Sequence, residues 1–424
     1  MQKPTNCRAR LRTGAVLPLA TVAVLAGGSV LPALAKDHSF QVVHSFAGGK
    51  KDGAEPFSYL IADQSGNLYG TTEIGGDNLK NCNPYVPGCG TVFKIAPDGA
   101  ETVLYAFAGP RAKHGAGPVC GLLEDSAGNL YGTAQAGGRF TDGTVFKLAP
   151  DGTEKTLHSF TGAQDGSYPL SNLVMDGKGD LFSTTQYGGD TQACSGAGCG
   201  VVFELAPDGT ETVLYSFTGG SDGAFAYSGL LKIAGNLYGT TQAGGDTKAC
   251  SGEGCGVVYE LTKGKGHTWA ERVLYAFKGG NDGSDPVFNL IADGAGSLYG
   301  TTVEGGNSGC SGSGCGTVFK IAPDGTETVL YSFTGGNDGA GPDGVIADKQ
   351  GNLYGTTDVG GAKGFGTVFK LAPDGTETTL HTFAGSDGSH PGGALLEVGP
   401  YLYGTTIEGG GIGINDGVVF RVKK

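Results

Sequence analysis

The sequence predicts a seven-bladed β-propeller in which each blade is a four-stranded antiparallel sheet. The first observation is a segment of the type LYGTT that recurs seven times, with steps of 49 to 62 residues. A period of this size is typical of propellers and solenoids, in which each unit is one supersecondary element. The second observation is that each unit holds four short segments rich in β-branched and aromatic residues, bounded by Gly, Pro, Asp and Asn. This is the pattern of strands separated by turns.

We name the four expected strands of a unit a to d in chain order. Strand a, for example Leu290–Asp293, is joined to strand b by a turn of the type DxxGN, whose Asp is expected to make the turn. Strand b is the LYGTT segment. Its seven copies are Leu68–Thr72, Leu130–Ala134, Leu181–Thr185, Leu237–Thr241, Leu298–Thr302, Leu353–Thr357 and Leu402–Thr406.

Strand c is a segment of the type GTVF, and a PDG turn joins it to strand d. Pro presets the first turn dihedral, Asp caps the turn and Gly tolerates a positive φ, so PDG predicts a tight hairpin. Strand d is a segment of the type LYSF. Its copies after a PDG or equivalent turn are Leu104–Phe107, Leu157–Phe160, Leu214–Phe217, Leu274–Phe277, Leu330–Phe333 and Leu380–Phe383.

The two ends of the repeat region are complementary. Gln41–Phe46 has the pattern of a strand d with no a, b or c before it, and the last unit ends with its strand c, Gly417–Lys424. Pairing these two segments would remove two open sheet edges, which are prone to aggregation. We therefore expect a ring closed by the N-terminal strand, which completes the last blade.

Residues 1–35 have the features of a signal peptide. A start with four basic residues, Lys3–Arg12, is followed by the apolar run Gly14–Val30 and by an A-x-A cleavage site at Ala33–Ala35. An uncleaved membrane anchor is the alternative, although Pro18 interrupts the apolar run. We expect residues 36–424 to form a single propeller domain that is exported to the periplasm or secreted.

The charge of the chain narrows the choice of partner. The net charge is −13, and loss of the basic leader takes it to −17. A strongly acidic chain is a poor match for nucleic acid or for an anionic membrane surface. Beyond residue 35 no apolar run is long enough to span a bilayer, so no membrane insertion is expected after signal cleavage. We expect a monomer whose partner is an extracytoplasmic glycan or protein.

Eight of the ten cysteines form four close pairs, each between strands b and c of its unit: Cys82 with Cys89, Cys194 with Cys199, Cys250 with Cys255, and Cys310 with Cys315. Zinc binding is the alternative for paired cysteines, but the spacings are five and seven residues rather than three, and no His accompanies them. In an exported protein we expect disulfides that pin their own loops, and no metal site. Cys120 is left over as a buried free thiol.

The connections of the predicted propeller divide between two faces. The b–c and d–a connections share one face, and the a–b and c–d connections share the other. The a–b and c–d turns are uniformly short, whereas the b–c and d–a connections are longer and more variable, for example Gly305–Gly316. Variable loops on a regular scaffold commonly carry binding sites. The b–c/d–a face is therefore the candidate functional face.

Each d–a connection carries an Asp-Gly pair, with a histidine in that place in the second unit. Because strand a lines the central channel, these side chains are expected around the channel mouth: Asp52, His114, Asp165, Asp222, Asp282, Asp338 and Asp387. Such a ring would suit a cation or a cationic ligand. The alternative is that Asp-Gly only makes the turn, and its presence in nearly every blade favours the turn.

The sequence offers no asymmetric catalytic constellation. It has no H-E-x-x-H motif and no localised acid pair, and we expect no cofactor. Trp269, in the expanded c–d hairpin, is open to either a packing or a sugar-stacking role. We favour a binding module that presents its pinned loops to a glycan or protein. The alternative is a propeller enzyme, a polysaccharide lyase or lactonase-like hydrolase, for which only His114 and His390 at the channel mouth give support.

The repeated string GNLYGTT…GTVFK(I/L)APDGTET, followed by LYSF, resembles the GloVer tandem repeat of bacterial exported proteins, the "choice-of-anchor" group. The match extends over Gln41–Lys424 and is most specific at Gly66–Thr72, Gly90–Gly99 and their counterparts. The resemblance implies a propeller-type repeat protein, and it implies no activity, cofactor or catalytic residue. Many members carry a C-terminal sorting segment, whereas this chain ends at Lys424 in its last strand, so soluble release is expected rather than surface anchoring.

Overall fold

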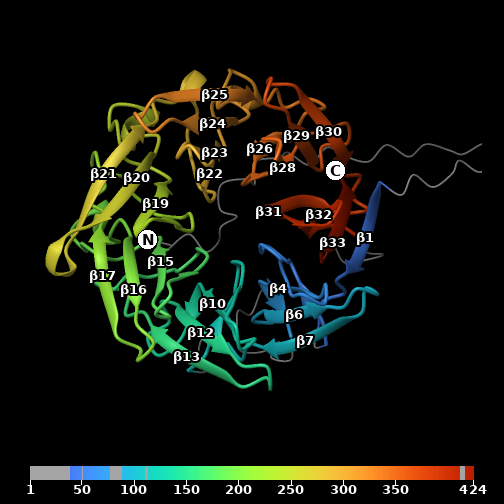
Figure 1. Ribbon diagram of the computed structural model, residues 1–424, viewed down its shortest axis with the longest axis horizontal. Coiled ribbons are helices and arrows are strands. Elements are labelled where there is room, and N and C mark those ends of the chain that lie inside the picture. Colours follow the sequence, from blue (N-terminus) through green and yellow to red (C-terminus); the bar gives the residue numbers. More distant parts are fainter. Residues whose placement is uncertain (1–38, 50, 77–87, 110–112, 411–415) are drawn as a thin grey trace, which may run out of the picture. The chain divides into compact units, whose positions relative to one another are not determined.

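Seven antiparallel sheets form a ring in the computed structural model (Figure 1). It describes residues 39–49, 51–76, 88–109, 113–410 and 416–424, and Phe40–Lys424 make up one compact unit. In each sheet the strands follow the order a, b, c, d, with strand a nearest the centre of the ring and strand d at its periphery. The predicted seven-bladed propeller is confirmed.

The strands of the seven blades are short and match the predicted segments. The a strands are β3 (Ile61–Ala62), β9 (Leu123–Glu124), β14 (Val174–Met175), β18 (Leu231–Ile233), β22 (Ile291–Ala292), β27 (Ile346–Ala347) and β31 (Ser389–Val398). The b strands are β4 (Leu68–Thr72), β10 (Leu130–Ala134), β15 (Leu181–Thr185), β19 (Asn236–Thr241), β23 (Leu298–Thr302), β28 (Leu353–Val359) and β32 (Tyr401–Glu408).

The two outer positions follow the same order from blade 1 to blade 7. The c strands are β6 (Thr91–Ile95), β12 (Thr144–Leu148), β16 (Val201–Leu205), β20 (Val257–Lys263), β24 (Thr317–Ile321), β29 (Thr367–Leu371) and β33 (Val418–Lys423). The d strands are β7 (Glu101–Ala106), β13 (Glu154–Ser159), β17 (Glu211–Ser216), β21 (Trp269–Ala276), β25 (Glu327–Ser332), β30 (Glu377–Thr382) and β1 (Phe40–Ser45).

The remaining elements belong to the connections. Short strands β2 (Gly53–Ala54) and β8 (Gly115–Ala116) pair with β5 (Ile74–Gly75) and β11 (Ala136–Gly137), and β26 (Ala340–Pro342) pairs with β28. Single 3₁₀ turns are η1 (Cys194–Gly196), η2 (Cys250–Gly252), η3 (Lys265–His267), η4 (Gly280–Asp282) and η5 (Cys310–Gly312). The cysteine-containing turns thus sit in b–c connections.

The ring is closed by the N-terminal strand. Strand β1 pairs antiparallel with β33, with Phe40 opposite Val422 and Ser45 opposite Val418, so blade 7 has the order β1-β33-β32-β31. The two segments contribute to one apolar cluster, in which Phe40 and Val42 pack against the buried Phe420 and Val422. The predicted exchange of one strand between the ends of the chain is therefore confirmed.

Aromatic pairs join each blade to the next. The Phe that follows each d strand, such as Phe107, contacts the aromatic residue in strand c of the following blade, such as Phe146. All seven pairs have ring centroids 5.1–5.2 Å apart and planes at 64–72°, which is the edge-to-face geometry that aromatic rings prefer. The Gly of LYGTT makes room for this ring, because a Cβ at Gly132 would lie 2.6 Å from Cζ of Phe146.

The threonines of LYGTT hold neighbouring blades together by hydrogen bonds. The hydroxyl of Thr71 donates to the carbonyl oxygen of Cys120 at 3.0 Å, and the hydroxyl of Thr184 donates to the carbonyl oxygen of Ser228 at 3.0 Å. Where blade 7 meets blade 1, the hydroxyl of Thr405 donates to the carbonyl oxygen of Ser58 at 3.3 Å. These contacts tie the middle of strand b to the segment that leads into strand a of the next blade.

The turns on the a–b/c–d face are stabilised as predicted. Asp63 accepts hydrogen bonds from the backbone N–H groups of Ser65 and Asn67, at 2.8 and 2.9 Å, and from the phenol of Tyr69 at 3.0 Å. These donors favour the carboxylate and lower the pKa of Asp63, against a raising effect of burial. The same contacts recur at Asp125, Asp293 and Asp348.

Candidate functional site

One backbone position on the b–c/d–a face has the same conformation in every blade and different side chains. It lies where the d–a connection enters the segment leading to strand a, and its φ is between 52° and 64° in all seven copies. We call this set the mouth ring: Glu55, Gly117, Tyr168, Phe225, Asp285, Gly341 and His390. A left-handed backbone costs a non-glycine residue roughly 1–2 kcal/mol. Five of the seven copies nevertheless carry a large or charged side chain.

The backbone around the mouth ring is uniform. The N–H group of Tyr168 donates to the carbonyl oxygen of Asp142 at 2.9 Å, and that of Phe225 donates to Cys199 at 2.8 Å. The equivalent bond joins His390 to Phe365 at 3.1 Å. Each mouth-ring residue is thereby tied to the end of the b–c connection of the preceding blade. Only the side chains change from blade to blade.

Blades 3 and 4 make the mouth ring aromatic. The rings of Tyr168 and Tyr187 lie 5.7 Å apart and those of Tyr187 and Phe225 lie 5.6 Å apart, each pair edge to face. All three side chains are half-buried. Beside them lie Gln186 and Gln242, whose N–H groups donate to the carbonyl oxygens of Tyr168 and Phe225 at 3.1 and 3.0 Å.

In blades 5, 7 and 1 the mouth ring carries ionisable side chains, Asp285, His390 and Glu55, and further ionisable groups lie beside it in blades 6 and 1. Nδ1 of His390 lies 3.1 Å from Oδ1 of Asp358, and the His side chain is 35% exposed whereas the Asp side chain is 10% exposed. Burial, and then the neighbouring Asp358, raise the pKa of Asp343 well above its ordinary value. In blade 1, Oε1 of Glu73 accepts a hydrogen bond from the amide of Gln135 at 3.2 Å.

The Asp-Gly carboxylates lie elsewhere, at the outer end of the d–a connections. Tyr215 donates its phenol proton to Asp222 at 3.0 Å, and the backbone N–H of Thr218 donates to the same oxygen at 2.8 Å. Asp282 and Asp338 accept from the phenols of their own d strands at 2.9 and 3.1 Å. Each of these carboxylates thus caps the end of a peripheral strand, whereas the repeat pattern predicted a place at the channel mouth.

Where strand d carries histidine in place of tyrosine, the same arrangement holds. Nε2 of His158 lies 3.3 Å from Asp165, and Nε2 of His381 lies 3.0 Å from Asp387. Oδ1 of Asp52 lies 3.8 Å from Nε2 of His44, and Asp52 accepts from the backbone N–H of Ala47 at 2.7 Å. These contacts favour the turn interpretation of Asp-Gly over a shared cation site.

His114, which replaces the Asp of the other blades, also lies at the peripheral end of its d–a connection. Its Nδ1 pairs with Oε2 of Glu154, the first residue of strand d in the next blade. The phenol of Tyr105 lies 3.5 Å from the same oxygen. His114 and His390 therefore serve different parts of the molecule, and only His390 lies on the mouth ring.

A glutamate occupies the Glu154 position at most other junctions between blades. Burial, together with a nearby Asp of the preceding blade, raises the pKa of four of these side chains to about 7: Glu101, Glu211, Glu271 and Glu327. The Oε1 atoms of these four glutamates are buried and have no hydrogen-bond partner in the described part of the chain. The junctions thus hold carboxyl pairs near the periphery of the ring.

Three of the predicted disulfides are formed, Cys194–Cys199, Cys250–Cys255 and Cys310–Cys315. Cys89 is disulfide-bonded as well, and its predicted partner Cys82 lies outside the described residues. The disulfide sulfurs pack on a glycine of the adjoining d–a connection, since a Cβ at Gly335 would lie 2.7 Å from Sγ of Cys310. Disulfides of this kind suggest an oxidising, extracytoplasmic environment. Cys120 is buried and is not part of a disulfide, as predicted.

Two of the three b–c connections without cysteines, those of blades 2 and 6, present an exposed aromatic ring instead. Asp142, Phe365 and Asp416 occupy the position of the second cysteine in blades 2, 6 and 7. Phe140 and Phe365, which are 44% and 38% exposed, are the exposed large hydrophobic side chains in the described chain. Both belong to the b–c/d–a face. Sequence reasoning missed them, and also the mouth ring, although the residue that precedes proline in most d–a connections was visible in the repeat.

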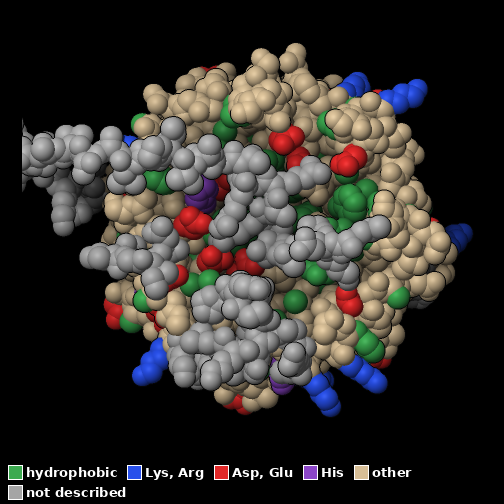
Figure 2. All heavy atoms as spheres, turned by 180° about the vertical axis from the view of Figure 1, so that it is seen from behind, with side chains coloured by type: hydrophobic (Ala, Val, Ile, Leu, Met, Phe, Trp, Pro, Cys, Tyr) green, Lys and Arg blue, Asp and Glu red, His purple; other side chains and the backbone are tan. Residues whose placement is uncertain are grey.

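Charge is unevenly distributed over the surface. On the face seen in Figure 2, acidic side chains and a histidine gather towards the middle of the ring, and Lys and Arg side chains lie at its edge. Within residues 39–49, 51–76, 88–109, 113–410 and 416–424, no group of three or more His, Cys, Asp or Glu side chains is arranged to hold a metal ion. The described helices include none with the length and hydropathy needed to cross a bilayer.

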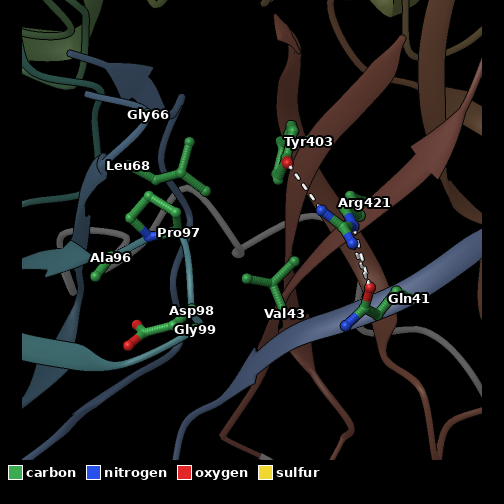
Figure 3. A pocket seen from close by; sticks show the side chains of 10 residues that line it. All are labelled: Gln41, Val43, Gly66, Leu68, Ala96, Pro97, Asp98, Gly99, Tyr403 and Arg421. Carbon is green, nitrogen blue, oxygen red and sulfur yellow. Dashed lines mark hydrogen bonds between the residues drawn. The ribbon is translucent and has the colours of Figure 1, made fainter. Parts of the chain in front are cut away.

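A small pocket lies at the closure of the ring, between blades 7 and 1 (Figure 3). The guanidinium of Arg421 points towards two partners there. It donates to Oε1 of Gln41 at 2.7 Å and to the phenol oxygen of Tyr403 at 3.4 Å. The facing wall is the PDG turn of blade 1, including Pro97 and Asp98. Because the polar groups of Arg421 and Gln41 are hydrogen-bonded to each other, we interpret the pocket as part of the ring closure.

Trp269 packs within its hairpin. It stands opposite Lys263 at the end of the β20–β21 pair, and the Lys263 ammonium lies 5.3 Å from the centre of its ring. The side chain is half-buried against the cluster of blade 4. The hairpin belongs to the face opposite the mouth ring.

Comparison with solved structures finds several enzymes with a similar fold. A puromycin-hydrolyzing peptidase from Mycobacterium tuberculosis is 13% identical with a TM-score of 0.51, over 89% of this chain and 54% of that one. A puromycin hydrolase mutant complexed with PGG is 14% identical with a TM-score of 0.51, over 83% and 50%. A gluconolactonase from Xanthomonas campestris is 13% identical with a TM-score of 0.41, over 74% and 85%. The likeness to the two puromycin-hydrolysing proteins shows the fold alone.

No curated protein matches the chain. A family model described as the Gloeobacter/Verrucomicrobia repeat matches residues 26–251, 84–311 and 247–424, and its three overlapping matches span the whole ring of blades. This is the repeat that the LYGTT, GTVF and PDG segments resembled. The chain belongs to the Gloeobacter/Verrucomicrobia repeat family.

Proposed function

We propose that the protein is an exported binding module that holds an extracytoplasmic ligand, a glycan or a protein, on its b–c/d–a face around the mouth ring. The observation that carries the proposal is the contrast at that ring between a uniform left-handed backbone and seven residues of six types. Glycine would fill this backbone position without strain. Glu, Tyr, Phe, Asp and His are present there at a cost in stability, which points to a role for their side chains.

Two further features support this face. The b–c connections that surround the ring are pinned by disulfides in blades 3, 4 and 5, so their loops are held in fixed positions before a ligand arrives. Such preorganisation reduces the entropy lost on binding. The two exposed phenylalanines lie on the same face. We expect the mature protein to act as a monomer in the periplasm or outside the cell.

The alternative function is hydrolysis or elimination at the same mouth, as in a lactonase-like hydrolase or a polysaccharide lyase. The observation in its favour is the His390–Asp358 pair, in which a buried carboxylate orients a partly exposed imidazole. A histidine held in this way is suited to general-base catalysis. Against it, His114 is engaged with Glu154 at the periphery and does not join His390.

The test uses variants that keep the backbone. Tyr168→Gly and Phe225→Gly remove a side chain at positions where Gly117 and Gly341 already adopt the same φ, so the backbone suits glycine, and circular dichroism melting verifies that both variants fold. The mature protein is probed with a glycan array and by pull-down with candidate proteins. We expect binding that these variants lose and that Trp269→Ala, on the opposite face, retains.

Two results would contradict the binding proposal. One is the absence of binding together with turnover of a lactone or polysaccharide that His390→Gln abolishes, which would establish the enzyme alternative. The other is binding that survives both glycine variants and is lost in Trp269→Ala, which would place the ligand on the a–b/c–d face.

A further inference from the structure

The mouth ring is divided into two chemically different sectors. In blades 3 and 4 an aromatic residue stands next to a glutamine, Tyr168 with Gln186 and Phe225 with Gln242, joined by backbone bonds of 3.1 and 3.0 Å. Elsewhere the ring carries ionisable side chains, such as Glu55, Asp285 and His390. The repeat itself does not require this division, because every blade has the same backbone at these positions.

The b–c connection of blade 2 continues the aromatic sector. Phe140 is 44% exposed, and the Arg139 guanidinium lies 5.3 Å from the centre of its ring. Two residues later the carbonyl oxygen of Asp142 accepts the N–H of Tyr168 at 2.9 Å. The connection that bears Phe140 therefore ends on the first aromatic residue of the mouth ring. From there the ring contacts of 5.7 and 5.6 Å lead through Tyr187 to Phe225.

We infer that this sector is an extended subsite for a neutral, unbranched oligosaccharide that runs across blades 2 to 4. The side chains that would hold it are Phe140, Tyr168, Tyr187, Phe225, Gln186 and Gln242. A pyranose offers an apolar C–H face for an aromatic ring, and Tyr adds a hydroxyl for hydrogen bonding. Its hydroxyl groups match the amide of glutamine, which both donates and accepts.

The absence of net charge among these six side chains sets the class of sugar. Uronic acid units would meet no cation among these six side chains, and the neighbouring Arg139 guanidinium is already engaged with the Phe140 ring. Amino sugars would find no carboxylate among these six side chains, whereas the other sector holds carboxylates such as Glu73 and Asp358. This inference rests on the proposed binding function and makes it specific to one ligand class and one part of the ring.

The experiment measures affinity by calorimetry for cello-, xylo- and mannohexaose and for their disaccharides, with an alginate hexamer and a chitosan hexamer as charged probes. Phe140→Ala is compared with Phe365→Ala, because both residues are exposed phenylalanines of cysteine-free b–c connections and lie in different sectors. Both variants should fold normally, and circular dichroism melting verifies this.

We expect at least one neutral hexaose to bind more tightly than its disaccharide, and Phe140→Ala to weaken that hexaose by roughly tenfold, the effect of about one stacked ring. Phe365→Ala should leave the affinity unchanged. Preference for a charged hexamer, equal effects of the two variants, or an unaffected Phe140→Ala would overturn the inference. If no saccharide binds but a purified protein ligand binds in a Tyr168-dependent way, the inference fails and the binding function stands. If nothing binds, both fail.

Discussion

The ring of Phe40 stacks on the imidazole of His381, with centroids 3.5 Å apart and planes within 6°. Phe40 begins the N-terminal strand, whereas His381 lies on strand d of blade 6. At the six other junctions this place is taken by the first glutamate of a d strand, and at the closure an aromatic residue replaces it. Phe40 also lies 5.7 Å from Phe420 of the last strand c. The N-terminal strand is therefore bound both to its own blade and to the neighbouring one.

Deleting residues 36–46 should destabilise the whole propeller. The deletion exposes the edge of β33 and removes Phe40, Val42 and Phe46 from apolar clusters of blades 7 and 1. Full burial of each such side chain contributes roughly 1.5–3 kcal/mol, so their combined loss approaches the net stability of a typical domain, about 5–15 kcal/mol. We expect aggregation or a large fall in Tm by differential scanning calorimetry.

The control is deletion of residues 36–39 alone, which leaves β1 intact and should melt like the parent protein. Equal and high Tm values for both truncations would mean that the strand exchange does not hold the ring together. Such a result would contradict the role assigned to the β1–β33 pair.

The sequence predicted most of the fold because its signals are local and repeated. PDG and DxxGN mark the turns by backbone chemistry, and the missing strands at the two ends predicted the closure. The repeat pattern also predicted Asp222 and its counterparts at the channel mouth. It placed them in the d–a connections, but it did not show whether they lie at the central or the peripheral end of each connection. The phenol of Tyr215 holds Asp222 at the peripheral end, and no local signal marks such a side-chain contact.

The mouth ring was not predicted for a related reason. Its residues share a backbone conformation and no side-chain pattern, so a search for repeated residue types passes over them. The usable signal was the opposite one, a variable residue before proline in connections that are otherwise uniform. His390 was singled out as a candidate residue, but its partner Asp358 follows the LYGTT segment of the preceding blade, where other blades carry Glu, Gln, Val or Ile.

Stability should rise as the pH falls from 8 towards 5. Burial raises the pKa of Glu101, Glu211, Glu271 and Glu327 to about 7, above the ordinary value of 4.5. Because the folded state binds these protons more tightly, ionisation destabilises it increasingly as the pH rises through 4.5 to 7, and fully above that range. Below about pH 4 the trend should reverse, since turn carboxylates such as Asp63 have a lowered pKa. Chemical denaturation across this pH range measures both limbs.

The junction glutamates provide a matched pair of variants for this effect. Glu271→Gln removes a carboxylate that faces Asp222 and should raise stability at pH 8 while flattening the pH dependence. Glu154→Gln removes the partner of His114 and should lower stability at the same pH. If both variants behave alike, the carboxyl pairs are not the source of the pH dependence.

Cys120 should be unreactive in the folded protein. Its side chain is buried. It occupies the position in the repeat that Ser58, Ser171 and Ser228 occupy in other blades. Mass spectrometry of mature protein should find one free thiol, and alkylation should label it only after denaturation. Cys120→Ser should change Tm by no more than a few degrees, because a serine already fits this position in three blades. Rapid alkylation of the native protein would show that the segment leading into strand a opens readily.

Removing one disulfide should act locally. Each bridge closes a loop of only five residues, for which the lost chain entropy is worth about 2 kcal/mol, and blades 2 and 6 show that the same connection forms without cysteines. In Cys250→Ala/Cys255→Ala we therefore expect a modest fall in Tm, with faster amide exchange confined to residues 245–256 and to the adjoining Gly279, on which the sulfurs pack. Cys120→Ser is the control for loss of a thiol elsewhere. Hydrogen–deuterium exchange that increases throughout blade 4 would instead show that the bridge supports the blade as a whole.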